Sequence, residues 1–459
     1  MKGQRLTNKQ KKTIFTFRKF SVNIFAVLMA LGAVAGLMFF LRPVTSEVEK
    51  RALTEFPKPS VSTLLNGQFF SDLSLWYSDT YPMRDALIAG AQKLEGARGI
   101  TPSTMMVGSR QKSDEIPSAE EAETETQEQT AAQEQTAADT VDKQEQTVEE
   151  ISAPDSRAME AEIQKQIQQN LYVKDGAAYS LYYYDQSAAD IYTTALSKAA
   201  AELKGQTEVY SILVPNNSGA MLTEEELTAL GGADQKQAID YYYSLTDNVK
   251  TIDTIDTLRE HNNEYLYFRT DHHWTQLAAY YVYQNFCEQK GIQPNQLSDF
   301  KKMTFSPFLG SFYQELQNKD MAANPDSVDA YVPMATNDLT FWEKDGSKVN
   351  WNVIRDVTGW NQNSLYSCFI GGDKPLAVIK NPNISDGSSC VVVKESYGNC
   401  FVPFLVDHYQ TVYVIDFRYT QNNVMDFVKK YHVQDLILIN NISIIASEDV
   451  SKTIAGLLE

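Results

Sequence analysis

The chain has 459 residues, of which 43% are hydrophobic and 11% aromatic, so it can bury a sizeable core and has room for two or three domains. Its formal net charge is -19 and its isoelectric point is about 4.8. This acidity repels phosphate backbones, and no basic stripe with interleaved aromatic residues follows the extreme N-terminus, which excludes nucleic acid as an expected partner.

The first predicted element is a membrane-spanning helix over residues 24–41. The stretch carries no charge, and its roughly 18 apolar residues are near the minimum for a spanning helix. Seven lysine and arginine residues lie in the preceding tail, residues 1–23, so the positive-inside rule predicts a cytoplasmic N-terminus and export of everything after Arg42. A cleaved signal peptide is the alternative, but no convincing cleavage site follows, and we favour a single-pass anchor in the cell membrane.

Two segments separate this helix from the main domain. Residues 42–110 are expected to form an N-terminal exported segment that packs on the domain that follows, because apolar residues such as Leu73 and Trp76 recur at helical spacing. Residues 111–156 consist mainly of Glu, Gln, Thr and Ala and carry 14 acidic residues against two lysines. This composition predicts a disordered, acidic, low-complexity insert.

Residues 157–459 read as an α/β domain, because predicted strands alternate with predicted helices. This alternation predicts a mostly parallel sheet with flanking helices. Between 301 and 379 the pattern is irregular, with turn dipeptides at 345–346 and 371–372, which favours a loop-rich insertion with β hairpins. The predicted strands are 209–214, 265–268, 390–394, 412–415 and 436–439, and the predicted helices include 191–203, 276–289 and 424–430.

The residues that point to chemistry lie in two loops of this domain. The chain has five histidines, and two of them, His272 and His273, directly follow Asp271, just before a helix that Thr275 can cap. Acyl transfer needs a nucleophile, a base that takes its proton, and a carboxylate that orients the base. Ser396 follows a predicted buried strand and precedes a glycine-containing turn, so it is a candidate nucleophile, although no Gly-x-Ser-x-Gly signature surrounds it.

These motifs resemble the DHHW family of bacterial exported proteins. The resemblance extends from about residue 49 to 459, apart from the acidic insert, and includes the tetrad Asp271-His272-His273-Trp274, the block from Lys394 to Asn399 and the stretch 414–419. That family is similar to the alginate O-acetyltransferase proteins, whose SGNH hydrolase-like domains carry Asp-x-His-Trp upstream of the serine. The resemblance implies an SGNH hydrolase-like fold with Ser396 as nucleophile, His273 as base and Asp271 as orienting carboxylate.

Several further residues are candidates for binding substrate or the oxyanion. The backbone amides of Ser396 and Tyr397 are expected to face the developing oxyanion. Asn216 could donate to it as well, although an asparagine in a turn more often bonds its own backbone. The remaining candidates are Arg418, Tyr419 and His272; for Arg418 the alternative is a salt bridge, and for Tyr419 a core phenol.

Two other residues near the motifs carry open questions. Ser311, in Gly310-Ser311-Phe312-Tyr313, also resembles the family's pattern, but no nearby base is evident in the sequence, and we interpret it as part of a structural turn. Glu395 precedes Ser396 where an aspartate is more usual in the family. The longer side chain puts its contribution to the site geometry in question.

No metal and no organic cofactor are expected. A metal hydrolase would use Asp271, His272 and His273 as ligands, but adjacent histidines seldom reach one ion. The four cysteines show no Cys-x-x-Cys spacing and are interpreted as buried thiols, with a Cys390–Cys400 bridge as the alternative in an exported domain.

The function expected from these features is extracytoplasmic O-acetyl transfer to a cell-surface or secreted polysaccharide. Acetyl-CoA is cytoplasmic, so transfer outside the cell requires a partner, and the resemblance implies a polytopic membrane-bound O-acyltransferase as acetyl donor. A carbohydrate acetylesterase shares the acyl-enzyme step and differs only in the attack of water. A noncatalytic polysaccharide-binding or assembly protein is the alternative from another class.

Overall fold

The structure is a computed structural model, and it describes residues 156–168 and 170–459, apart from 344, 421 and 422. Before residue 156 it describes only 42–43, 45–46, 51–52, 56–57, 69, 73, 76–77, 80–83, 104–108 and 113–117. The predicted membrane helix at 24–41 and most of the predicted insert at 111–156 therefore lie outside the described residues. None of the helices within the described ranges is long and apolar enough to cross a membrane. The chain divides into two compact units, Met1–Ile100 and Thr101–Glu459.

The described part of the first unit contains a short antiparallel pair, β1 (Thr45–Ser46) and β2 (Arg51–Ala52), and a cluster around Arg42. The guanidinium carbon of Arg42 lies 4.0 Å from the centroid of the Trp76 ring, and its Nη1 donates to Thr80 Oγ1 at 2.8 Å. Trp76 is buried, so it contributes to packing within this unit.

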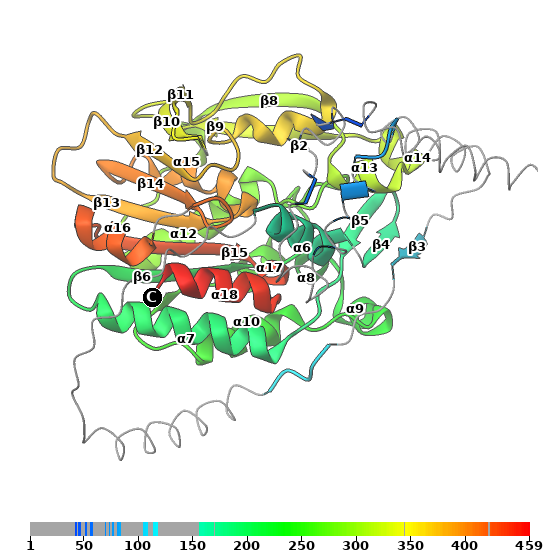
Figure 1. The fold of residues 1–459 in the computed structure, drawn as a ribbon, viewed down its shortest axis with the longest axis horizontal. Coiled ribbons are helices and arrows are strands. Elements are labelled where there is room, and N and C mark those ends of the chain that lie inside the picture. The colour runs from blue at the N-terminus through cyan, green and yellow to red at the C-terminus, as the bar shows by residue number, and fades with distance from the viewer. Residues whose placement is uncertain are drawn as a thin grey trace, which may run out of the picture. The chain divides into compact units, whose positions relative to one another are not determined.

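The second unit is a mixed α/β structure built on one eight-stranded sheet (Figure 1). The strand order is β11-β10-β12-β14-β13-β15-β6-β7, in which β14, β13, β15, β6 and β7 are parallel and β12, β10 and β11 run antiparallel to their neighbours. The bounds are β6 Glu208–Val214, β7 Lys250–Thr251, β10 Asp338–Trp342, β11 Lys348–Asn352, β12 Leu376–Lys380, β13 Ser389–Lys394, β14 Thr411–Asp416 and β15 Asp435–Asn441.

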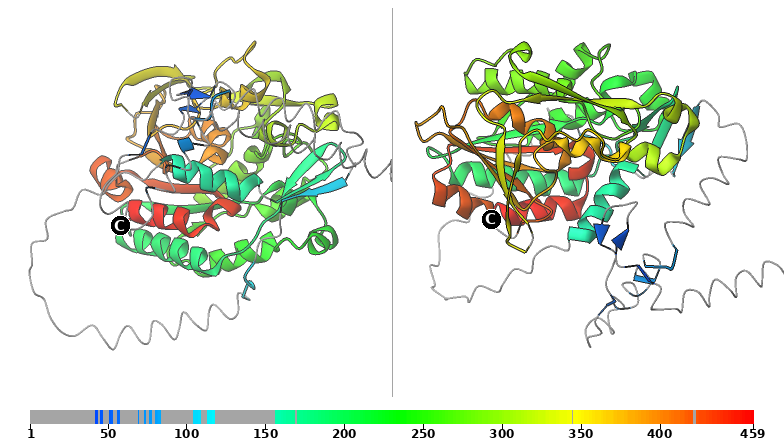
Figure 2. Two further views of the ribbon diagram at one scale, coloured as in Figure 1. Left: turned by 45° about the vertical axis from the view of Figure 1, so that its right-hand side comes forward. Right: turned by 90° about the horizontal axis from the view of Figure 1, so that it is seen from above.

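The parallel strands are buried on both faces, as expected of a sheet covered by helices. In β13, Val391 and Val393 join one hydrophobic cluster, whereas Cys390 and Val392 join the other, because successive side chains point to opposite faces. Helices α7 (Gln186–Glu202), α10 (Gln235–Ser244), α16 (Val424–Tyr431) and α18 (Glu448–Leu457) contribute to the first cluster, and α12 (Gln276–Lys290) and α15 (Val402–Leu405) to the second. Figure 2 again shows the red helix α18 beside the green helix α7.

Four of the five predicted strands are confirmed as β6, β13, β14 and β15, and the three predicted helices as α7, α12 and α16. The predicted strand at 265–268 is wrong. This segment folds back on the loop that follows it, with Thr275 N donating to Leu266 O at 2.8 Å and a single bridge between Tyr267 and Trp274. The Thr275 side chain caps α12 by accepting from Ala278 N, as the sequence predicts.

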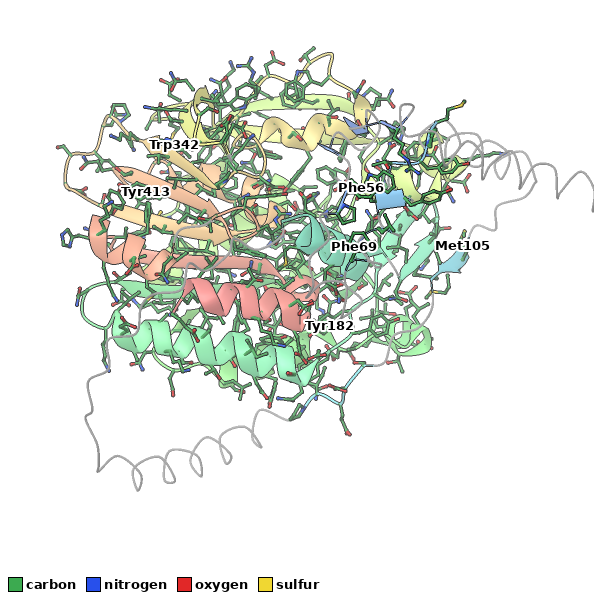
Figure 3. All side chains as sticks on the ribbon, viewed as in Figure 1. Phe56, Phe69, Met105, Tyr182, Trp342 and Tyr413 are labelled. Carbon is green, nitrogen blue, oxygen red and sulfur yellow. The ribbon has the colours of Figure 1, made fainter. Side chains whose placement is uncertain are left out.

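The region 301–379 is irregular, as predicted, and contains a β hairpin, β10–β11. Strand β8 (Lys301–Phe308) pairs with β9 (Asp326–Val332) in a separate two-stranded sheet, and β10 pairs with β11 across a turn in which Gly346 has φ +80°. Helices α13 (Ser311–Leu316) and α14 (Lys319–Ala323) and the 3-10 segment η3 (Gln362–Cys368) complete this insertion. In Figure 3 the labelled Trp342 of β10 lies on the same side of the molecule as Tyr413 of β14.

A smaller antiparallel sheet joins β3 (Thr104–Val107), β4 (Leu171–Lys174) and β5 (Ala177–Ser180), and Met105, labelled in Figure 3, lies on β3. Residues 113–117 also contact the domain, because Tyr184 N donates to Ser113 Oγ and Asp114 N to Tyr184 O, both at 3.0 Å. The insert boundary predicted at 111 is therefore too early. The remaining elements are α6 Ser156–Gln168, α8 Asn217–Met221, α9 Glu224–Leu230, α11 Ile255–Glu260, η2 Leu297–Asp299, η4 Ser396–Cys400 and α17 Ile442–Ile445.

Candidate active site

The candidate nucleophile lies at the carboxyl end of β13, which is flanked by the parallel strands β14 and β15. Strand β13 ends at Lys394, and η4 begins at Ser396. Within the run from 391 to 400, Ser396 is the residue that is not buried. Gly398 makes this tight turn possible, since a Cβ there would lie 2.6 Å from Lys394 Cβ. The strand thus presents one accessible hydroxyl from an otherwise buried segment.

Asp271, His273 and Ser396 form a continuous hydrogen-bonded chain. His273 Nδ1 lies 2.6 Å from Asp271 Oδ1, and His273 Nε2 lies 2.8 Å from Ser396 Oγ. Asp271 Oδ1 also accepts from His273 N at 3.0 Å. An ionised carboxylate only accepts, so Nδ1 carries the ring proton and Nε2 is left to accept the Ser396 hydroxyl proton. The sequence placed these groups in separate loops, and the structure brings them into contact.

The environment of Asp271 keeps it ionised. Burial alone would raise the pKa of this carboxyl, but the charge interactions with His273 and His272, together with hydrogen bonds from His273 and Ser311, hold the pKa below its usual range. Ser311 N donates to Asp271 Oδ2 at 2.7 Å, so both carboxylate oxygens have donors. The preceding residue must be glycine, because a Cβ on Gly310 would lie 2.2 Å from Asp271 Oδ2.

The imidazole of His273 is held between two other rings. Tyr366, from η3, stacks on one face with a centroid distance of 3.9 Å and an interplanar angle of 14°, and His272 lies on the other at 3.8 Å and 36°. The Tyr366 hydroxyl donates to Ser396 O at 3.0 Å. Tyr366 therefore contacts both the base and the backbone of the nucleophile. The sequence offered no signal for this contact beyond an aromatic residue in an irregular region.

Ser311 is part of the site, contrary to the interpretation that it forms only a structural turn. Its Oγ lies 2.7 Å from His272 Nδ1. The sequence did not reveal that this histidine contacts Ser311. The contact joins residues 39 positions apart, and the turn before α13 creates it. Burial, followed by the neighbouring His273, lowers the pKa of His272 to about 3, so this second imidazole is neutral at pH 7.

Comparison with known proteins identifies the family. The DHHW protein profile matches residues 49–415. The chain belongs to the DHHW family. It is similar in structure to a DHHW family protein from Eubacterium siraeum, with a TM-score of 0.57 and 27% identity over 63% of this chain and 96% of that one. No sequence among the curated proteins matches.

Two structures of Bacillus cereus PatB1 are also similar in fold. The first has a TM-score of 0.53 and 20% identity, covering 62% of this chain and 99% of that one. The second, which carries a sulfonyl adduct, has a TM-score of 0.51 and 18% identity over 62% and 97% of the two chains.

In this DHHW protein the glutamate before the serine has a defined structural task. Glu395 is fully buried, and its two carboxylate oxygens accept from Tyr397 N at 2.8 Å and Asn441 N at 2.9 Å. The longer side chain thus links the start of η4 to the end of β15. One prediction is thereby wrong: the Tyr397 amide is engaged by Glu395 and does not face an oxyanion. Burial raises the pKa of Glu395, opposed by these hydrogen bonds.

The Tyr397 side chain and the other predicted binding residues are used structurally. The Tyr397 hydroxyl donates to the His272 carbonyl, and the Tyr419 hydroxyl donates to Glu160. Asn216 Nδ2 donates to Ser443 Oγ at 2.6 Å. Among the described residues, Asn216 forms no hydrogen bond with Asp271, His273 or Ser396.

Arg418 belongs to a group of four charges at the ends of β13 and β14, of which Asp373 is partly exposed and the other three are buried. It donates to both oxygens of Asp416, at 2.8 and 2.6 Å, and to Asp373 at 2.9 Å, and Lys394 Nζ contacts the same two carboxylates at 2.8 and 2.9 Å. Burial opposes the charge on Arg418, but the two aspartates raise its pKa well above its usual value. The salt-bridge alternative is therefore the one the structure shows.

Asp271, His272 and His273 form the group among the described residues whose ligand atoms lie close enough to hold a metal, within 4.8 Å of one another. Their nitrogen and oxygen atoms already bond to one another, to Ser311 and to Ser396. A metal would have to replace these hydrogen bonds. All four cysteines are free and buried, so Cys390 and Cys400 are not bridged.

Proposed function

We propose that this DHHW protein transfers an acetyl group to a hydroxyl of a cell-surface or secreted polysaccharide through a covalent acyl-Ser396 intermediate. The observation that carries the proposal is the hydrogen-bonded chain from Asp271 through His273 to Ser396, with distances of 2.6 and 2.8 Å. These groups, in these roles, are the ones that activate a serine for acyl transfer. An accessible serine at the carboxyl end of a central parallel strand also fits an SGNH hydrolase-like fold.

The chemistry follows from the protonation states in the site. Ser396 Oγ attacks the acyl carbonyl carbon while His273 Nε2 takes the hydroxyl proton, and the carbonyl oxygen becomes an oxyanion. When this intermediate collapses, the bond to the leaving oxygen breaks, and the leaving oxygen takes the proton from His273. The product is an ester on Ser396. Asp271 stabilises the imidazolium form of His273 in both steps.

The second half of the reaction distinguishes a transferase from an esterase. A sugar hydroxyl gives its proton to His273 Nε2 and attacks the ester carbon, and Ser396 Oγ leaves and recovers the proton. Water would give hydrolysis by the same steps. Transfer is favoured by the resemblance to alginate O-acetyltransferases. It also fits the sequence features at 1–41, which support a membrane-anchored, extracytoplasmic domain beside a polytopic O-acyltransferase that supplies the acetyl group.

The test uses the chain with para-nitrophenyl acetate as an acetyl donor. We expect nitrophenol release and an acetyl mass on Ser396, with turnover falling by about 10³-fold or more in Ser396→Ala and His273→Ala. Ser385→Ala, an exposed loop serine, is the matched control and should retain activity. Sugar polymers added to the reaction then show whether transfer competes with hydrolysis.

A sulfonyl fluoride provides a second, independent readout, suggested by the adduct in the similar PatB1 structure. It should label Ser396 in the wild-type chain and not in His273→Ala, because only the activated hydroxyl reacts quickly. Wild-type protein that releases no nitrophenol and takes up no label would contradict the acyl-enzyme proposal.

A further inference from the structure

The position of His272 beside His273 determines where its second nitrogen points. Both Nδ1 atoms lie on the Asp271 side, at 2.6 Å from Oδ1 for His273 and 3.8 Å for His272, and the two rings lie 3.8 Å apart. Nδ1 and Nε2 occupy opposite sides of an imidazole. His272 Nε2 therefore lies on the side of the paired rings where His273 Nε2 meets Ser396 Oγ.

Ser311 selects the tautomer of His272. Its Oγ lies 2.7 Å from His272 Nδ1 and accepts from the His272 backbone N–H at 3.4 Å. Among the described residues the Ser311 hydroxyl has no acceptor other than Nδ1, and donation to Nδ1 is the arrangement on which the inference rests. An imidazole that accepts at Nδ1 carries its proton at Nε2. His272 is thus a neutral N–H donor directed toward the nucleophile.

This donor is available. His272 Nε2 bonds to none of the described residues, and it is also not one of the buried atoms that lack a partner, so it reaches solvent. The site needs such a group, because the Tyr397 amide is engaged by Glu395 and only the Ser396 amide of the expected pair is left without a partner among the described residues. Oxyanion sites for acyl transfer combine several preorganised donors.

The neutrality of His272 suits the role. Burial and His273 hold its pKa near 3, so it stays uncharged while His273 passes through its imidazolium form. The charged groups that act on it are His273, Asp271, Arg418 and Asp373. A second cation stacked on His273 would oppose proton transfer from Ser396, whereas a neutral N–H donor does not.

We propose that His272 is a further catalytic residue, which donates a hydrogen bond from Nε2 to the oxyanion formed on attack by Ser396, and that Ser311 is the positioning residue that holds it in this tautomer. The inference rests on the proposed acyl transfer and deepens it by assigning the oxyanion donor. The deciding geometry is the Ser311–His272 hydrogen bond together with the stacking of His272 on His273.

Two amide variants separate the nitrogen atoms of His272. In His272→Gln the amide nitrogen can occupy the place of Nε2, whereas in His272→Asn it can occupy only that of Nδ1, near Ser311. We expect kcat for para-nitrophenyl acetate to fall by about 10²-fold in His272→Asn with KM unchanged, and to recover to within about 5-fold of wild type in His272→Gln. Ser311→Ala should lower kcat by about 10-fold, and Ser311→Thr, which keeps the hydroxyl, should restore it.

The outcomes are distinguishable. Equal kcat for the Asn and Gln variants, whether both are active or both inactive with wild-type unfolding midpoints, overturns the donor role of His272. A parallel rise in KM would also overturn it, because an oxyanion donor acts in the transition state. If the wild-type chain shows no Ser396-dependent turnover, the proposed function fails and the inference fails with it. If turnover depends on Ser396 but kcat of His272→Asn equals that of wild type, only the inference about His272 fails.

Discussion

The buried neutral histidine predicts a specific loss of stability on mild acidification. In the unfolded chain a histidine has a pKa of about 6.5, whereas burial and the neighbouring His273 lower the pKa of His272 to about 3 in the folded protein. Between these values the unfolded state binds one more proton than the folded state, so stability falls as the pH falls. Above about pH 6.5 His272 is unprotonated in both the folded and the unfolded state, so its contribution to the free energy of unfolding no longer changes with pH.

The size of the effect follows from the difference between the two pKa values. Each pH unit between them costs about 1.4 kcal/mol of unfolding free energy, so lowering the pH from 7 to 5 should cost about 2 kcal/mol through His272. Asp271, whose pKa is also lowered in the folded state, adds a loss only below the usual aspartate range near pH 4. The window from pH 5 to 7 therefore excludes the contribution of Asp271. Burial raises the pKa of Glu395, which acts in the opposite direction in wild type and variant alike, so the contribution of His272 is the difference between the two proteins.

The assay is urea unfolding at pH 7 and pH 5, followed by circular dichroism, for the wild-type chain and His272→Gln. We expect the variant to lose about 2 kcal/mol less than wild type over this interval. His408→Gln is the control: burial also lowers the pKa of His408, but it lies outside the site, bonded to Tyr283. An equal loss in wild type and His272→Gln would refute the assignment of a neutral, buried His272.

Three substitutions test the contacts around the site. Asp271→Asn removes the acceptor that keeps the His273 proton on Nδ1, and kcat for acetyl transfer should fall by about 10⁴-fold, measured with para-nitrophenyl acetate. Gly310→Ala places a Cβ 2.2 Å from Asp271 Oδ2 and should lower kcat by about 10-fold or more by displacing the carboxylate. Lys394→Met leaves the buried Asp416 carboxylate short of one cation and should cost about 3 kcal/mol in urea unfolding.

The glycine and lysine substitutions each have a matched control. Gly456→Ala adds a Cβ with nothing within 4 Å and should leave kcat unchanged. Lys236→Met breaks a pair with Asp240 in which both side chains are more exposed, and it should cost less than about 1 kcal/mol. Full activity in Asp271→Asn would contradict the assignment of the His273 proton to Nδ1. Full activity in Gly310→Ala would contradict the claim that a Cβ at this position displaces Asp271. Equal losses of unfolding free energy in the two lysine variants would contradict the claim that burial strengthens the Lys394 ion pairs.

The secondary structure of the α/β domain could be read largely from local pattern. Continuous apolar runs mark β6, β13, β14 and β15, and apolar residues at helical spacing mark α7, α12 and α16, because burial on two faces or on one stripe leaves a local signature. The loop at 265–268 carries the same kind of apolar run and is therefore predicted as a strand. Its apolar residues pack in the core, but their backbone bonds close a turn around His273, and no pattern in the residues encodes that difference.

The sequence by itself offered Asp271 and His273 as carboxylate and base, because histidine is scarce and the two stand together before a helix, and Ser396 as a candidate nucleophile after a buried strand. The resemblance to the DHHW family joined the three as one triad. Tertiary structure alone decided which other groups join them. Ser311 and Tyr366 reach the two histidines from the insertion, Glu395 takes the Tyr397 amide, and Arg418 joins a buried ion network instead of the site. These contacts link residues far apart in the chain, and the direction of a side chain across such distances depends on how strands and loops pack rather than on neighbouring residues.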